Sequence, residues 1–167
     1  MSTMWKLLDQ RPDAKSERYG DGWVNSERCQ GCSFIRCCCA GGGYTYDAED
    51  FPEINPSNAS EKIAELLRTG EYIIERRPTY DDTDMCVVEA APRYELSGYV
   101  SPCVHYDVYT GCQKRFEDRP AMCRKFKPGD NNSEGCEIDP TEKADIISSW
   151  KPFQNILEQL VDVQDVT

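Results

Sequence analysis

Clustered cysteines constrain this chain more than any other feature of its sequence. Ten cysteines occur among 167 residues, about twice what an average protein of this length needs. Half of them stand in one short segment, at Cys29, Cys32, Cys37, Cys38 and Cys39. A chain with so many closely spaced thiols must either oxidise them into disulfides or use them to bind metal.

The sequence lacks the usual signals for export or membrane insertion. Residues 1–15, MSTMWKLLDQRPDAK, contain no apolar run suited to a signal peptide. No stretch approaches the roughly 18 apolar residues of a membrane span. We therefore expect a soluble, cytoplasmic protein. Because the cytosol keeps thiols reduced, the clustered cysteines indicate metal binding rather than disulfides.

Composition and charge narrow the class of protein further. A chain that is 39% hydrophobic and 29% charged has the make-up of a folded globular protein. The net charge of −11 would repel phosphate groups, so we expect neither a nucleic-acid partner nor a membrane partner. The sequence leaves the oligomeric state open. We interpret residues 1–28 as a polar N-terminal arm and residues 29–167 as one cysteine-cluster metal-binding domain.

Local patterns predict the main elements of that domain. A capping box at Asn58–Glu61 and a C-terminal Gly70 predict a helix over 58–69. Asp139 as N-cap and a helical apolar face predict a second helix over 140–163, kinked or broken at Pro152. A helical turn is expected between Asp47 and Ile54, and short strands or extended ligand arms within 71–77, 85–90 and 98–108. The expected fold class is a small, irregular α+β domain organised by metal.

The spacing of the cysteines suggests how they bind metal. Cys29 and Cys32 form a CxxC pair, in which a tight turn directs two thiolates at one centre. The triplet Cys37 to Cys39 cannot easily converge on a single tetrahedral ion, because neighbouring side chains diverge. The second half supplies Cys103, Cys112 and Cys123 at wide intervals, unlike a zinc ribbon or a zinc finger. Such a site must be assembled by the fold, and removing its metal should loosen the whole domain.

A basic segment lies among the cysteines of the second half. Its basic side chains are Lys114, Arg115, Arg119, Arg124, Lys125 and Lys127. Cations and the bare amides of Gly41–Gly43 would offset the charge of gathered thiolates. Pro120 is suited to begin a short helix that includes Cys123. Arg119 and Arg124 either balance or bind an anionic cofactor or substrate, or form surface ion pairs with acidic neighbours.

Two segments of the chain carry a family resemblance. They are CQGCSFIRCCCAGGGYTYDAEDFPEI and CVHYDVYTGCQKRFEDRPAMCRKF, the second with Gly-Cys, an aromatic residue and Glu-x-Arg-Pro-x-x-Cys-Arg-x-Phe in order. Over about residues 29–127 the chain resembles the YkgJ-type cysteine-cluster family of zinc- or iron-chelating domains with a CxxC…CC motif. The resemblance implies metal ligation by Cys29, Cys32, a pair within Cys37–Cys39, Cys103, Cys112 and Cys123. The glycines favour Cys38 and Cys39 as the pair, whereas counting from Cys32 favours Cys37 and Cys38.

The resemblance leaves the reaction open. The leading hypothesis is an iron–sulfur cluster, slightly favoured, or bound zinc or iron ions. One branch of the family is similar to the cysteine-rich part of flagellin lysine N-methylases. This similarity implies, as the alternative function, a protein-modifying or redox enzyme that acts on a protein substrate or partner. The glycines at 41–43 follow a cysteine loop rather than a strand and are no nucleotide fingerprint. His105 as a ligand, and Cys86 and Cys136 as buried thiols or ligands, remain open.

Overall fold

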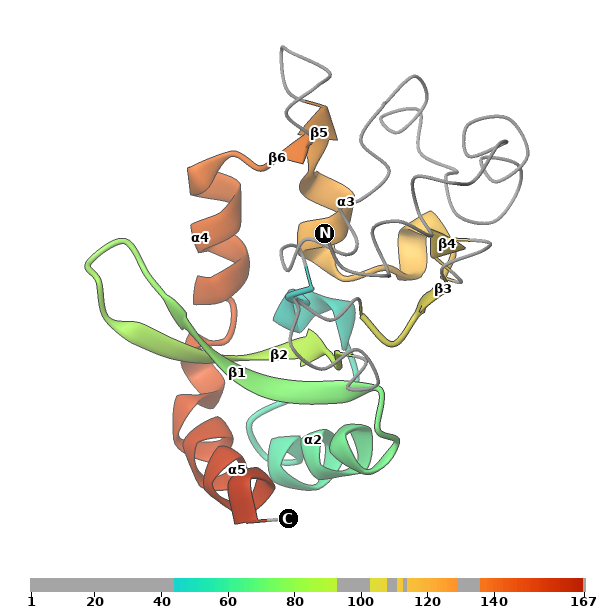
Figure 1. The fold of residues 1–167 in the computed structure, drawn as a ribbon. Coiled ribbons are helices and arrows are strands. Elements are labelled where there is room, and N and C mark those ends of the chain that lie inside the picture. Colours follow the sequence, from blue (N-terminus) through green and yellow to red (C-terminus); the bar gives the residue numbers. More distant parts are fainter. Residues whose placement is uncertain (1–43, 93–102, 108–110, 113, 129–135, 167) are drawn as a thin grey trace. The chain divides into compact units, whose positions relative to one another are not determined.

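The structure is a computed structural model that describes residues 44–92, 103–107, 111–112, 114–128 and 136–166 (Figure 1). The chain divides into two units. The first consists of Met1–Gly43, Pro92–Arg119 and Arg124–Ile138, and the second of Tyr44–Ala91, Pro120–Cys123 and Asp139–Thr167. Antiparallel strands and separate helices give the α+β fold class that the sequence predicts. The arm expected over 1–28 lies outside the described residues.

A β-hairpin forms the centre of the second unit. Strand β1, Tyr72–Pro78, pairs antiparallel with β2, Asp84–Ala90, in the register that places Ile74 opposite Val88. The β-branched and aromatic residues of both segments favour strands. The loop between them closes through the hydrogen bond from Thr79 N to Thr83 O, 2.8 Å. Asp82 adopts a left-handed conformation there, with φ of 57°, which aspartate tolerates better than most residues.

Residues Tyr44–Tyr46 extend this sheet on the other side of β2. Tyr46 N donates to Val88 O and Ala90 N donates to Tyr44 O, both at 3.0 Å. Thr45 is thereby placed opposite Glu89 in an antiparallel bridge. The second unit thus begins with an extended segment that is hydrogen-bonded to β2.

Three helices pack against the hairpin. Helix α5, Gln154–Val166, packs against both strands, and α2, Ala59–Arg68, packs against β1 and α5 (Figure 1). Helix α4, Pro140–Ser148, contacts β2 and is joined to α5 by the 3-10 helix η5, Lys151–Phe153. The break predicted at Pro152 is therefore confirmed. The helical turn expected after Asp47 is the 3-10 helix η2, Ala48–Asp50.

The helix ends follow the sequence in two cases and depart from it in one. The Asp139 carboxylate accepts hydrogen bonds from Thr141 N and Glu142 N, so it caps α4 as predicted. Gly70 ends α2 with φ of +78°, also as predicted. The capping box at Asn58 is wrong, because this side chain does not cap α2. It instead accepts from Asn55 N and donates to Glu53 O, which stabilises the turn that precedes the helix.

Two glutamines of α5 pair with the backbone of the hairpin at its two outer sides. Gln154 accepts from Cys86 N at 2.9 Å and donates to Cys86 O at 2.8 Å. Gln164 does the same to Ile74, at 3.0 and 3.1 Å. A side-chain amide presents an acceptor oxygen beside a donor nitrogen, so it can satisfy the N–H and C=O of a strand residue that face no neighbouring strand. The two contacts fix how α5 crosses the hairpin.

The core of the second unit is apolar and aromatic. Trp150 is fully buried, and its indole Nε1 donates to Tyr46 O at 2.7 Å. The centroid of the Trp150 ring lies 6.1 Å from the ring centroid of Phe51 and 5.9 Å from that of Phe153. The largest aliphatic side chains that are fully buried are Ile63, Ile74, Val87, Val88, Ile147 and Leu157. Helices α2, α4 and α5 and the hairpin thus all contribute side chains to the hydrophobic core.

The described parts of the first unit are short. Strand β3, Tyr106–Asp107, pairs with β4, Gly111–Cys112, and β5, Lys127–Pro128, pairs with β6, Cys136–Glu137. The 3-10 helix η4, Phe116–Asp118, precedes helix α3, Ala121–Lys125, which spans the boundary between the units. The extended segment expected over 98–108 is described only from Cys103 to Asp107, where β3 lies.

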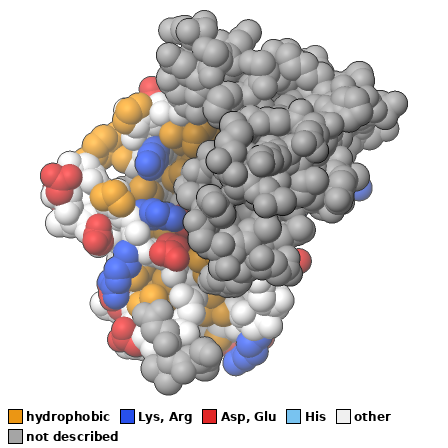
Figure 2. Space-filling view, in the orientation of Figure 1, with side chains coloured by type: hydrophobic (Ala, Val, Ile, Leu, Met, Phe, Trp, Pro, Cys, Tyr) orange, Lys and Arg blue, Asp and Glu red, His pale blue; other side chains and the backbone are white. Residues whose placement is uncertain are grey.

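The described surface mixes charged and apolar side chains. Acidic and basic side chains alternate with hydrophobic ones over the described part of the face shown in Figure 2. Among the described residues, no helix combines the length and the apolar character required to cross a membrane.

Candidate metal centre

The structure describes the predicted ligands unequally. The first cysteine segment, with Cys29, Cys32, Cys37, Cys38 and Cys39, lies outside the described residues. Cys103, Cys112 and Cys123 lie within them, on different elements. Their assignment as a common ligand set therefore stays a prediction.

Cys103 and Cys112 belong to the first unit. Cys103 is 7% exposed, and its backbone forms an isolated antiparallel bridge with that of Pro92. The backbone of Cys112 pairs with that of Tyr106 in the short β3–β4 ladder. His105 lies between them in sequence and is half-buried. The backbone at both cysteines is thus held by antiparallel pairing.

Two arginines of the basic segment form hydrogen bonds with its backbone. Arg119 is buried, with 6% of its surface exposed. Its Nε donates to Lys114 O at 3.2 Å. The Arg124 guanidinium donates to the carbonyl oxygens of Arg119 and Glu117, at 2.5 and 3.3 Å. Both side chains therefore fix the backbone that leads into α3, and their predicted role toward a cofactor is untested.

Cys123 lies in α3, the short helix that Pro120 was predicted to begin. It is half-buried. One residue earlier, Met122 N donates to Thr45 O at 3.1 Å. The start of α3 is thereby bonded to the extended segment Tyr44–Tyr46, which directly follows the cysteine and glycine segment 29–43 in the sequence.

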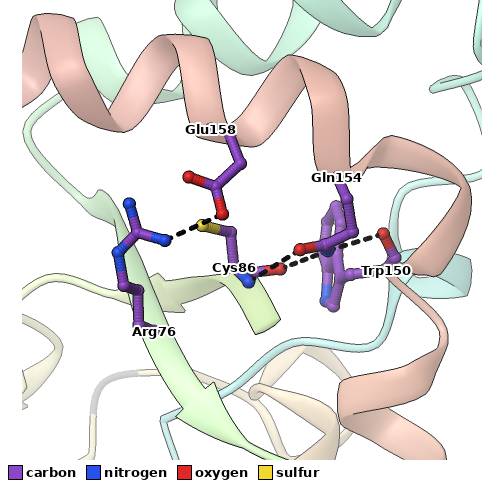
Figure 3. Close-up of polar contacts among 5 residues, drawn as sticks. All are labelled: Arg76, Cys86, Trp150, Gln154 and Glu158. Carbon is purple, nitrogen blue, oxygen red and sulfur yellow. Dashed lines mark hydrogen bonds and ion pairs between the residues drawn. The ribbon is translucent and has the colours of Figure 1, made fainter. Parts of the chain in front are cut away.

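Cys86 occupies a different environment, on β2 beneath α5 (Figure 3). It is a free thiol with no exposed surface. Its backbone is paired with Gln154, and Glu158 of α5 lies beside the sulfur. Glu158 also forms an ion pair with Arg76, with 2.8 Å between Oε1 and the guanidinium nitrogen.

Burial controls the ionisation of this thiol. Desolvation first, and then the hydrogen bond and negative charge of Glu158, raise the pKa of Cys86 from 9.0 to about 11. The hydrogen bond from Arg76 lowers the pKa of Glu158, so this carboxylate remains charged next to the sulfur. Cys86 is thus a buried thiol that stays protonated at neutral pH.

A buried charged network at Glu89 was not among the features that the sequence predicted. Glu89 of β2 is 2% exposed and accepts from Thr45 Oγ1 at 2.6 Å and from Arg77 Nε at 2.7 Å. The second nitrogen of the Arg77 guanidinium donates to the other carboxylate oxygen. The hydrogen bond to Glu89 raises the pKa of Arg77. The signal available in the sequence was a single acid inside the apolar run CVVEAA, where an unpaired carboxylate would be costly.

Within the described ranges, no three His, Cys, Asp or Glu side chains lie close enough together to hold a metal ion. Comparison with known proteins supplies no further assignment. No protein-family model, curated protein or solved structure matches the chain.

Proposed function

We propose that the protein binds an iron–sulfur cluster, or zinc or iron ions, through cysteines from both halves of the chain. The ligand set is Cys29, Cys32, two of Cys37 to Cys39, Cys103, Cys112 and Cys123, as in the YkgJ-type family that the sequence resembles. Thiolates suit both iron–sulfur clusters and zinc. Ten cysteines slightly favour a cluster with spare thiols.

One hydrogen bond carries most weight in support of this proposal. Met122 N and Thr45 O are 3.1 Å apart, so the residue before Cys123 is bonded to a residue only six positions after Cys39. Six residues of extended chain span at most roughly 21 Å. The segment Tyr44–Tyr46, which follows the first cysteines in the sequence, is therefore hydrogen-bonded to the helix of Cys123 at Thr45.

The rest of the proposal follows from the chemistry of thiols. Reduced cysteines persist in the cytoplasm, and we place the protein there. A protein partner or substrate is part of the proposal, because a small cluster domain supplies chemistry or electrons to something larger. Nucleic acid is not a proposed partner, given the net charge of −11.

Anaerobic purification followed by visible spectroscopy and elemental analysis tests the proposal. We expect a brown protein containing iron and sulfide, or a colourless one containing zinc. The chain offers a matched pair of variants, Cys123→Ser and Cys86→Ser. The first removes a proposed ligand, and the second removes a buried thiol that the proposal leaves outside the site.

The two variants should behave differently. Cys123→Ser is expected to lose a large part of the bound metal, because loss of one thiolate opens the coordination sphere. Cys86→Ser is expected to retain the wild-type metal content. Wild-type protein that contains no metal, or equal metal loss in both variants, would contradict the proposal.

A further inference from the structure

Strand β1 has an outer edge that faces away from β2. Among the described residues, no strand pairs with this edge, whereas Tyr44–Tyr46 pair with the far side of β2. An open edge presents N–H and C=O groups with which a strand of another molecule can pair. A protein that avoids such pairing must block the edge.

The register shows which residues of β1 present their backbone at this edge. In an antiparallel pair, successive residues direct their N–H and C=O alternately toward the partner strand and away from it. Val88 and Ala90 bond to Tyr44–Tyr46 on the side away from β1, so the β1 residues opposite them point away from β2. The residues of β1 that point outward by this alternation are Tyr72, Ile74 and Arg76. Ile74 is therefore the centre of the edge.

Gln164 of α5 occupies this central position. Its Oε1 accepts from Ile74 N at 3.0 Å, and its Nε2 donates to Ile74 O at 3.1 Å. An opposing residue makes the same two bonds in a hydrogen-bonded antiparallel pair, so the side chain replaces a partner strand at Ile74. The outward positions that remain, Tyr72 and Arg76, are roughly 13 Å apart along the strand. Without Ile74 between them they do not form a continuous ladder.

A second copy of this chain is the partner that fits the edge. A two-fold axis at Ile74 would pair the two β1 strands antiparallel, with Ile74 opposite its own counterpart. Tyr72 would then lie opposite Arg76, and Glu71 would lie opposite Arg77. This register sets no like charges opposite each other, which would disfavour pairing. The glutamine of α5 and the second copy would compete for the same two backbone groups.

We infer that Gln164 blocks the outer edge of β1 against pairing with a second copy of the chain. One side chain is enough, because it uses both groups of the central residue. Gln154 pairs in the same way with Cys86 on β2, beyond the positions that Tyr44–Tyr46 cover. Neither glutamine is a proposed metal ligand, so this inference is independent of the proposed function.

Two variants of the full chain test this inference under reducing conditions. Gln164→Ala removes both hydrogen bonds to Ile74 and introduces a good helix former. Gln159→Ala is the matched control, because Gln159 lies on the same helix and is exposed. Sedimentation velocity over a range of protein concentrations measures self-association. Hydrogen–deuterium exchange at the same concentrations measures the protection of the β1 amides.

Gln164→Ala should self-associate reversibly, at concentrations at least about tenfold lower than wild type and Gln159→Ala, because two strand groups become available for pairing. Exchange of the β1 amides should then slow as the concentration rises, since an added strand protects them. A glutamine that only stabilises the fold would instead leave self-association unchanged and let these amides exchange faster at every concentration. Equal self-association in both variants, or association without slower exchange in β1, overturns the inference.

Discussion

The buried thiol of Cys86 makes the stability of the folded protein depend on alkaline pH. Folding raises its pKa from 9.0 to about 11. Between these values the thiol ionises in the unfolded chain and stays protonated in the folded one. Since the unfolded state then binds fewer protons, stability falls as the pH rises through 9 and levels off above 11. Below pH 9 the thiol is protonated in both states, and its full contribution is present.

The size of this effect follows from the shift. One pKa unit corresponds to about 1.4 kcal/mol, so a shift from 9.0 to about 11 gives a loss of roughly 2 to 3 kcal/mol. The full value applies because Cys86 has no exposed surface. A loss of this size is a large fraction of the stability of a small domain.

Urea unfolding between pH 8 and pH 11.5 (roughly the span over which a thiol with this shift titrates), under reductant, measures this loss. Cys86→Ser is the control, because serine keeps the shape and a donor toward Glu158 but does not ionise there. All other cysteines, tyrosines and lysines titrate in both proteins, so the difference between the two curves isolates Cys86. Parallel curves for wild type and Cys86→Ser would refute the argument that burial beside Glu158 keeps this thiol protonated.

Two further predictions concern stability. Gly70→Ala should destabilise the protein by about 1 kcal/mol in thermal or urea unfolding. Gly70 has φ of +78°, and an added methyl group would meet only open space, so the loss comes from backbone strain alone. An unchanged unfolding midpoint would contradict this. Trp150→Phe should lower the free energy of unfolding by about 2 to 4 kcal/mol. The smaller ring leaves space in the core and removes the indole N–H that donates to Tyr46 O at 2.7 Å. A smaller loss of stability than in Gly70→Ala would contradict this prediction.

Elements with strong local signals were predictable from the sequence. The helix expected over 58–69 is α2, Ala59–Arg68, and the break expected at Pro152 separates α4 from α5. Helical periodicity, a proline and an N-cap aspartate act within a few residues, so these signals can be recognised in the sequence alone. Asn58 shows the limit of such patterns, because a second local partner, the turn at Asn55, competes for its side chain.

Contacts between distant segments were not predictable. Gln154 and Gln164 are ordinary helix residues by pattern, yet each completes the backbone pairing of a strand about 70 to 90 positions away. The partners of Glu89 likewise follow from strand register, which its own neighbours do not define. For the candidate metal site, cysteine spacing predicts the ligands but not whether the fold brings them together.

The architecture also bears on how far metal organises the chain. The second unit comprises about 80 residues, a size at which a single hydrophobic core gives modest stability. Its core of Trp150, Ile63, Leu157 and the hairpin contains no proposed ligand, and Cys123 at its margin is the one proposed ligand in this unit. If the proposed ligands bind metal, its removal should therefore loosen chiefly the first unit, where the remaining proposed ligands lie, rather than the whole domain, as the cysteine spacing alone led us to expect.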